Sequence, residues 1–153
     1  TCKKNRAKYL GWIMNSKHLC QATRPIAWGE MDAFGHLNNV HYFRYIEDAR
    51  IAFLEAVDFF QYPLYSVVLK NECIYKQPVV YPDTLTTQAF VTHVGNTSFS
   101  MHYEIYSQAQ NRSIATAQSV IVLVCKESFE KREIPEAMKL KLITYMQQFI
   151  HAA

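Results

Sequence analysis

The sequence has few charged residues and no long apolar run. Only 19% of its 153 residues are charged, whereas 50% are hydrophobic. This composition excludes a disordered chain, because enough apolar surface is available to build a core. No apolar run approaches the roughly 20 residues that are needed to span a bilayer. We therefore expect one soluble globular domain, large enough to fold without disulfides or metals.

Cysteine pairs are also missing. The four cysteines are Cys2, Cys20, Cys73 and Cys125, and no two of them form the Cys-x-x-Cys pair that is typical of zinc or redox sites. We expect free thiols in a reducing cytoplasm, with no metal and no cofactor. The apolar stretch 9–14 that follows the basic start is too short for a secretory signal, which agrees with a cytoplasmic location.

A dense positive charge is lacking as well. The formal net charge is +3, and much of the excess comes from the first eight residues. Nucleic-acid-binding domains usually carry a denser basic stripe or a recognisable motif. We therefore expect no nucleic-acid partner and no membrane partner, whereas a phosphate-bearing small molecule would suit this charge.

The segment between Pro25 and Pro63 contains a helical pattern. Apolar residues recur there at alternating steps of four and three, namely Tyr42, Ile46, Ala49, Phe53, Ala56 and Phe60. This spacing predicts a helix from about residue 39 to residue 60 with one buried face. Asn38 or Asn39, just before the apolar stripe, can accept a hydrogen bond from an unpaired amide of the first turn.

After Pro63 the pattern changes to a period of two, which predicts half-buried strands. We expect strands over 23–28, 65–75, 85–94, 98–105 and 114–124, the last covered on both faces near its end. Gly95 and Asn96 tolerate the positive φ of a tight hairpin turn. A closing helix follows Pro135, with a second apolar stripe of Met138, Leu142, Tyr145 and Phe149. This order predicts an α+β domain in which a sheet packs on one long helix.

The densest run of polar and aromatic residues joins the first strand to the long helix. It reads Trp28-Gly-Glu-Met-Asp-Ala-Phe-Gly-His-Leu-Asn-Asn-Val-His-Tyr-Phe-Arg-Tyr-Ile-Glu-Asp-Ala-Arg50. The run resembles the signature of the 4-hydroxybenzoyl-CoA thioesterase-like branch of hotdog-fold proteins, in which an aromatic-rich strand end precedes an Asp, a Gly, an Asn-Asn pair and a helix with Glu-x-Ala-Arg. Glu30 departs from the pattern, since related proteins often have aspartate there. Downstream, Tyr75-Lys-Gln-Pro-Val-Val-Tyr-Pro-Asp-Thr-Leu85 resembles the same family.

This resemblance covers about residues 23 to 146. It implies a hotdog fold, an antiparallel sheet wrapped around one long central helix. We assign residues 22–153 to this domain and leave the N-terminal segment 1–21 unassigned. The resemblance further implies hydrolysis of an acyl-CoA to free acid and CoA, without metal or cofactor, at a site shared between two subunits of a homodimer or of a homotetramer built as a dimer of dimers.

Asp32 falls on the family's catalytic carboxylate. Such a group can act as a general base on water or attack the thioester carbonyl as a nucleophile, and the sequence does not separate the two. The structural alternative is that Asp32 only caps a turn. The oxyanion amide of the family comes from the start of the long helix, where the backbone amide of Asn39 matches best and that of Val40 is one residue away.

The expected substrate-binding residues flank these two groups. Gly35 lets the backbone approach a ligand closely, and His36 could touch the substrate or Asp32. Asn38 could cap the helix or touch the substrate. Phe34 and Tyr42 belong to a set of aromatic residues expected to form the acyl pocket, with Phe43, Phe59, Phe60 and Tyr62. Lys70, Lys76 and Arg112 are candidate partners for the CoA phosphates.

Three alternatives stay open. A second hotdog lineage places its catalytic carboxylate on the long helix, where this chain has Glu47, although an ion pair of Glu47 with Arg50 explains that residue equally. The protein could instead be a non-catalytic module that binds acyl thioesters, since architecture does not dictate chemistry. A third possibility is a thioesterase whose acyl group arrives on acyl carrier protein.

Overall fold

The computed structural model describes residues 20–152. Its strands are β1 (Cys20–Pro25), β2 (Leu64–Tyr75), β3 (Thr84–Val94), β4 (Ser98–Ser107) and β5 (Arg112–Cys125). Its helices are α2 (Tyr42–Ala56) and α3 (Glu136–Ala152), with short 3₁₀ turns η1 (Trp28–Glu30), η2 (Asn39–His41) and η3 (Phe59–Gln61). The predicted order of strand, long helix, four strands and helix is confirmed. Most of the unassigned segment 1–21 lies outside the described residues.

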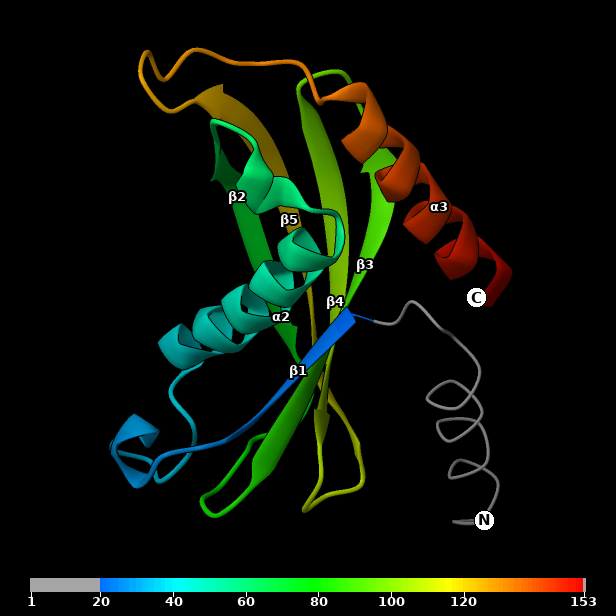
Figure 1. Cartoon of the computed structure of the whole chain (residues 1–153). Coiled ribbons are helices and arrows are strands. Elements are labelled where there is room, and N and C mark those ends of the chain that lie inside the picture. The colour runs from blue at the N-terminus through cyan, green and yellow to red at the C-terminus, as the bar shows by residue number, and fades with distance from the viewer. Residues whose placement is uncertain (1–19, 153) are drawn as a thin grey trace.

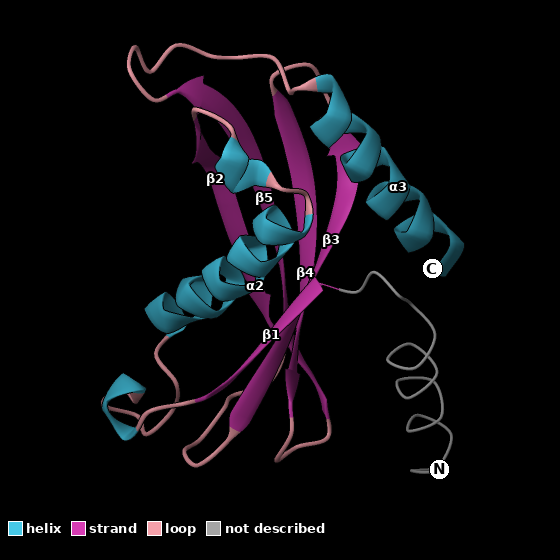
Figure 2. Ribbon diagram, in the orientation of Figure 1, coloured by secondary structure: helices cyan, strands magenta, loops and turns pink. Residues whose placement is uncertain are grey.

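The five strands form one antiparallel sheet in the order β1-β3-β4-β5-β2, so β1 and β2 are its edges. Figure 1 shows α2 lying across one face of this sheet and α3 lying beside β3. Figure 2 shows that the long connections gather at the two ends of the sheet. The α+β class is therefore confirmed. Within residues 20–152, no helix combines the length and the apolar character needed to cross a bilayer.

The period-two pattern places alternate side chains in the core. In β4, Phe99, Met101, Tyr103 and Ile105 are all buried in the core, while their neighbours in sequence are only half-buried. Four consecutive residues of β5, from 121 to 124, are buried, which confirms the prediction that the end of this strand is covered on both faces.

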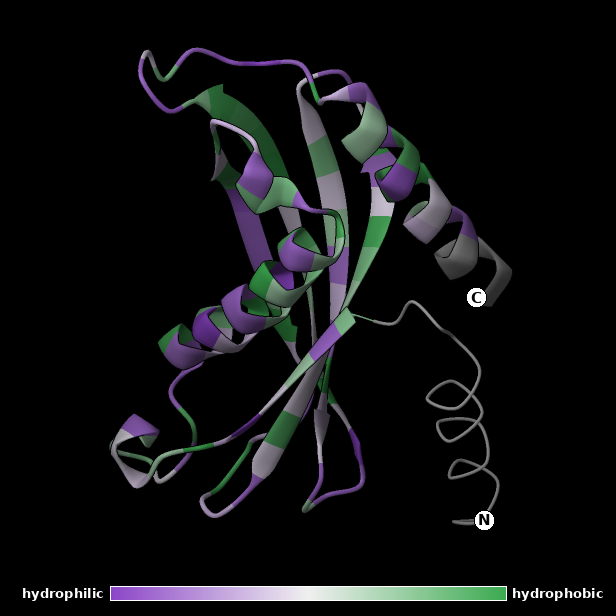
Figure 3. Cartoon of the chain, viewed as in Figure 1, coloured by the Kyte–Doolittle hydropathy of each residue, from purple (hydrophilic) through white to green (hydrophobic). Residues whose placement is uncertain are grey.

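The helix α2 follows its apolar stripe only to Phe53. Tyr42, Ile46, Ala49 and Phe53 are buried, and Figure 3 shows hydrophobic and hydrophilic residues alternating around this helix. The prediction that Ala56 and Phe60 continue the stripe is wrong, because both are exposed. The helix ends at Ala56, and Asp58 then takes a left-handed conformation with a φ of 56°. The turn changes which residues face the core, and Val57 and Phe59 are buried instead.

The hairpin between β3 and β4 needs its glycine for a different reason from the one expected. No positive φ occurs at Gly95 or Asn96. Instead, the Gly95 amide donates a hydrogen bond of 2.8 Å to the carbonyl oxygen of Ser98. A Cβ at Gly95 would lie 3.0 Å from that same oxygen. The close approach of the two backbones, not the φ angle, therefore favours glycine here.

The helix α3 completes the core beside β3. Met138 and Leu142 are buried, and the ring of Tyr145 lies 5.3 Å from that of Phe53, as the second apolar stripe predicts. The side chain of Phe149, the last predicted member of the stripe, lies outside the described part. The edge strand β2 leaves large apolar side chains exposed, with Leu69 69% accessible.

Candidate active site

The candidate catalytic loop is a tight turn between η1 and η2. An antiparallel bridge joins Met31 to Leu37, and the amide of Asp32 donates a hydrogen bond of 2.7 Å to the carbonyl of His36. Gly35 has a φ of 77°, a left-handed conformation that costs other residues strain energy. The glycine therefore makes this turn possible and leaves its backbone uncovered.

The carboxylate of Asp32 is bound to this turn through one of its two oxygens. Oδ1 accepts hydrogen bonds from the amides of Phe34, at 2.8 Å, and His36, at 3.2 Å. No described residue donates a hydrogen bond to the other oxygen, Oδ2. Asp32 therefore caps a turn and at the same time presents a fixed, unused acceptor.

The start of the long helix lies directly after this loop. The side chain of Asn38 accepts a hydrogen bond of 3.2 Å from the amide of Val40, so Asn38 is the helix cap. The carbonyl of Asn38 accepts the amide of His41 at 3.0 Å. Within the described chain, the amide of Asn39 has no acceptor. Of the two amides considered for an oxyanion, that of Val40 is occupied and that of Asn39 is available.

The last residues of β2 lie against this helix start. The hydroxyl of Tyr75 donates a hydrogen bond of 3.2 Å to the carbonyl of Asn39, and its ring meets that of Tyr42 edge-on at 4.8 Å. Burial raises the pKa of Tyr42 to about 12, with smaller contributions from Cys73 and Tyr75. Burial also raises the pKa of the Cys73 thiol. These groups are therefore neutral near pH 7 and form a largely uncharged wall.

Glu30 supports the loop from behind. Its carboxylate accepts hydrogen bonds from the Ala27 amide at 2.8 Å and the Tyr45 hydroxyl at 2.6 Å, and it pairs with Arg24 at 2.9 Å. Burial alone would raise the pKa of Glu30, but these hydrogen bonds and the charge of Arg24 outweigh it and lower that pKa. Because Tyr45 belongs to α2, the network ties η1 to the long helix.

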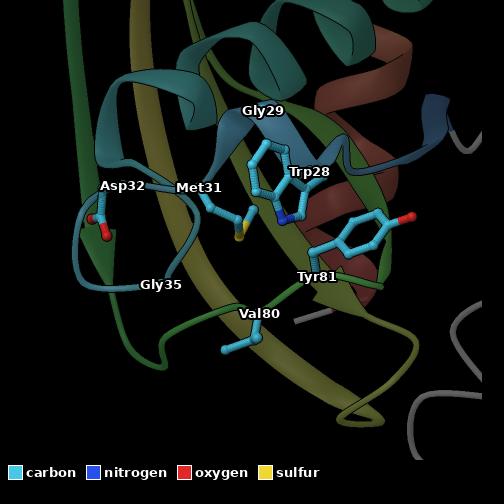
Figure 4. A pocket seen from close by; sticks show the side chains of 7 residues that line it. All are labelled: Trp28, Gly29, Met31, Asp32, Gly35, Val80 and Tyr81. Atoms are coloured by element: carbon cyan, nitrogen blue, oxygen red, sulfur yellow. The ribbon is translucent and has the colours of Figure 1, made fainter.

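A cavity of about 480 Å³ opens beside Asp32. Its lining comprises Trp28, Gly29, Met31, Asp32, Gly35, Val80 and Tyr81. Figure 4 shows Trp28 near Tyr81, with Asp32 at the far side beyond Met31. The sequence alone assigns no role to Trp28, Met31, Val80 or Tyr81, although both segments belong to the stretches that carry the family resemblance. The expected acyl-pocket aromatics do not line this cavity, and Phe34 is 84% exposed.

The long-helix carboxylate has a different partner from the one expected. Glu47 forms an ion pair of 3.0 Å with Arg44, and the expected pairing with Arg50 is wrong. Arg50 lies on the buried face of α2 beside the apolar stripe and is 8% exposed, whereas Glu47 and Arg44 lie on the outer face of this helix. Glu47 does not contribute to the lining of the cavity.

The other charged candidates contribute little to the site. Lys70 pairs with Glu72 at 2.8 Å, which leaves Lys76 and Arg112 as exposed cations for a phosphate. Over residues 20–152, no group of three His, Cys, Asp or Glu side chains is arranged to hold a metal ion. Cys20, Cys73 and Cys125 are free thiols, and Cys2 lies outside the described residues.

Comparison with known proteins identifies the family. A family model described as the thioesterase-like superfamily matches residues 26–142. The uncharacterized protein YsmA of Bacillus subtilis (strain 168) is 30% identical over 105 residues, which cover 67% of this chain and 71% of YsmA.

Solved structures share the fold. The PA2801 protein from Pseudomonas aeruginosa is 26% identical with a TM-score of 0.73, over 82% of this chain and 99% of PA2801. The DHNA-CoA thioesterase from Staphylococcus aureus is 17% identical with a TM-score of 0.67, over 88% of this chain and 87% of that one. The expected hotdog fold is thereby confirmed. Because the family model spans most of the sequence and YsmA resembles two thirds of it, this chain belongs to the thioesterase-like superfamily.

Proposed function

We propose that this protein is an acyl-CoA thioesterase that hydrolyses an acyl-CoA to free acid and CoA. Membership of the thioesterase-like superfamily favours thioester hydrolysis in general. The observation that carries the finer assignment is the geometry of Asp32, whose Oδ1 is held by two amides while Oδ2 faces no donor. Asp32 also lines the cavity, where a bound ligand can reach it.

The chemistry needs two groups from this chain. As a general base, Oδ2 of Asp32 removes a proton from the water that attacks the thioester carbonyl, and the CoA thiolate leaves and is protonated. As a nucleophile, the same oxygen attacks the carbonyl and the CoA thiolate leaves and is protonated, which gives a mixed anhydride; water then hydrolyses this anhydride to the free acid and the Asp32 carboxylate. In both routes the amide of Asn39 donates a hydrogen bond to the developing oxyanion, since it has no other acceptor.

The remaining residues bind the substrate around these two groups. Gly35 and His36 present loop backbone next to Asp32, and Asn38 and Val40 hold the helix start in shape. Tyr42 is buried at the first turn of α2 and packs edge-on against Tyr75, so it supports the helix start from within. Phe34 extends outward from the loop and would contact a group at the rim. The DHNA-CoA thioesterase of Staphylococcus aureus, which has the same fold, supports a CoA thioester as the substrate.

Assembly through β2 forms part of the proposal. β2 is a 12-residue edge strand that pairs with β5 on one side only. The backbone groups on its outer side and its exposed apolar side chains would favour pairing with another strand. Pairing with β2 of a second copy gives a homodimer, and two dimers give a homotetramer. Because Tyr75 at the end of β2 bonds to Asn39, a partner at this edge would lie close to the candidate site.

Light scattering tests this assembly. Leu69→Lys is expected to shift the protein toward monomer and to lower its activity. Leu140→Lys is the matched control, since Leu140 is an exposed leucine on α3, 59% accessible, and lies away from the edge. A parent protein that is a stable monomer with full activity would exclude the shared site.

The test of the function is thiol release from short, long and aromatic acyl-CoAs by the parent and by Asp32→Asn. Asn keeps the oxygen that the two loop amides contact but removes the charge. We expect turnover by the parent and a fall of at least about a hundredfold in the variant, or about 2.7 kcal/mol of barrier. Glu47→Gln is the control and is expected to retain activity. Binding of CoA without turnover would support a non-catalytic binding module. Turnover of acyl carrier protein thioesters alone would show that the acyl group is delivered on acyl carrier protein and not on CoA.

A further inference from the structure

Trp28 and Tyr81, the aromatic residues of the cavity beside Asp32, have no part in the hydrolytic steps, and we call their side of this cavity the Trp28–Tyr81 cleft. Trp28 is 74% exposed and Tyr81 is 45% exposed, although both are large aromatic side chains. Exposed apolar surface concentrated in a concavity is typical of a binding site. Asp32 lines the same cavity at its far side, so a ligand that contacts Asp32 can pass Met31 and reach these aromatic residues.

Both walls of the cleft are fixed in place. The Trp28 wall is held by Glu30, which bonds to the Ala27 amide and to the Tyr45 hydroxyl. The opposite wall, formed by Val80 and Tyr81, follows the fully buried Val79. The carbonyl of Val79 accepts a hydrogen bond of 2.8 Å from the Leu37 amide, and Leu37 is itself bridged to Met31 of the opposite wall, so the two walls are connected. A preformed site of this kind loses little conformational entropy when a ligand binds.

The lining favours a neutral, flexible chain. It contains one carboxylate, that of Asp32, and no cation, so it offers no partner for the phosphates of a nucleotide. The cleft is also open on one side, and its aromatic residues stay in contact with water, unlike the enclosed surface that an apolar acyl group requires. The amides and methyl groups of a pantetheine arm suit an apolar wall with water opposite.

The two glycines of the lining provide the polar contacts that such an arm needs. A Cβ added at Gly29 or Gly35 would meet no heavy atom within 4 Å, so the space above both backbones is open. The Gly35 amide already donates to the Asp32 carbonyl at 3.0 Å, so the Gly29 peptide and the Gly35 carbonyl are the groups that can hydrogen-bond the amides of a ligand. An amide plane can also lie flat on the indole of Trp28.

We propose that the Trp28–Tyr81 cleft binds the pantetheine arm of the thioester substrate. The thioester carbonyl then lies between Asp32 and the amide of Asn39, the arm leaves along Trp28 and Tyr81, and the acyl group extends to the other side, away from Trp28. This inference rests on the proposed function and makes it more specific. Recognition is by the arm that CoA and acyl carrier protein share, and the adenosine end contributes little.

A fluorescence titration tests the binding without any turnover. The chain has two tryptophans, Trp12 and Trp28, so Trp12→Phe leaves Trp28 as the sole indole. CoA and pantetheine are expected to change its emission with similar midpoints, whereas N-acetylcysteamine, which lacks most of the arm, needs at least about tenfold more. The adenosine bisphosphate half of CoA is expected to have no effect. A response to that half equal to the response to CoA would overturn the proposal, as would no response to pantetheine.

Kinetics then separate the arm from the acyl group. For Trp28→Leu we expect KM for an acyl-CoA to rise about tenfold, or about 1.4 kcal/mol, with kcat nearly unchanged. When the same acyl group is carried on N-acetylcysteamine, Trp28→Leu should hydrolyse it as well as the parent does. Trp28→Phe should restore part of the affinity for the acyl-CoA. Phe129→Leu is the control, because Phe129 is an exposed aromatic residue that contacts Tyr65 at the opposite end of β2.

The two proposals fail in different ways. An equal rise in KM for the full and the truncated thioester would place the acyl group, not the arm, in the cleft and would refute this inference alone. A parent that hydrolyses no thioester would refute the proposed function, and the fluorescence titration would still decide whether the cleft binds pantetheine.

Discussion

Replacing Glu30 by Gln removes one charge from the network that holds η1 against α2. The carboxylate accepts three hydrogen bonds, from the Ala27 amide, the Tyr45 hydroxyl and the Arg24 guanidinium. A glutamine in the same position keeps one acceptor oxygen, which can still serve Ala27 and Tyr45 because both contact the same Oε2. Its amide nitrogen then faces the guanidinium of Arg24, donor against donor.

The expected loss of stability follows from these contacts. A hydrogen bond to a charged group contributes about 1.5 to 3 kcal/mol and a neutral one about 0.5 to 1.5 kcal/mol. Arg24 is partly exposed, and solvent weakens its ion pair with Glu30. We therefore expect Glu30→Gln to lower the free energy of unfolding by about 2 kcal/mol, which is a fall of about 4 to 8 °C in Tm for a domain of this size.

The pH dependence has a definite sign. The pKa of Glu30 is lowered from its ordinary value of 4.5 in the folded state. The ionised carboxylate therefore stabilises the fold above pH 4.5, and this contribution is lost as the pH falls through the folded-state pKa. The difference between parent and variant should accordingly be largest near pH 7 and shrink below about pH 4.5.

Urea unfolding at pH 7 and again below pH 4.5 measures both effects. Protein concentration is kept constant, because subunit association would also contribute to stability. A variant within about 0.5 kcal/mol of the parent at pH 7 would refute the reasoning. So would a difference that grows as the pH falls.

Three further predictions concern single sites. Asp32→Ala removes both hydrogen bonds that the side chain accepts within its loop and should cost about 1 to 2 kcal/mol, measured by thermal unfolding. Gly95→Ala places a Cβ 3.0 Å from the backbone oxygen of Ser98 and should cost about 1 to 3 kcal/mol in the same assay. Among the three described cysteines, Cys125 should be the thiol that iodoacetamide alkylates fastest at pH 7, as mass spectrometry can show, because hydrogen bonds from the amides of the turn that follows lower its pKa to about 7.

Each of these has a matched control. Asp32→Asn keeps the oxygen that caps the loop, so a loss of stability equal to that of the Ala variant would contradict the capping role. Gly29→Ala meets no heavy atom within 4 Å and should be nearly neutral for stability. Burial raises the pKa of Cys20 and Cys73, so faster alkylation of either would contradict the third prediction.

Local patterns in the sequence predict most of the fold. A period of two is readable within one strand, which is why the buried residues of β4 are predicted correctly. The end of α2 is different, because the left-handed conformation of Asp58 redirects the chain. The spacing of apolar residues in the sequence does not predict this turn. Arg50 is a similar case. Its charge suggests an exposed ion pair with Glu47, yet its position on the stripe buries it.

The sequence likewise predicts one part of the candidate site and not the other. Asp32, Asn38 and Asn39 belong to one short segment, so the sequence predicts them together. Val80 and Tyr81 come from the connection between β2 and β3 and reach the site only because the folded chain docks that connection against the loop. A contact between distant segments that depends on a backbone hydrogen bond leaves no trace in residue type.

The hydrogen bond from Leu37 to Val79 also controls how the cleft moves. The Leu37 amide can exchange its proton with solvent only when this bond opens. Opening exposes Val79, which is fully buried and whose burial is worth about 1.5 to 3 kcal/mol. The separated state is therefore a minor one, populated on the order of one part in ten to one in a hundred, and the cleft walls open as a local unfolding event and not as a freely moving flap.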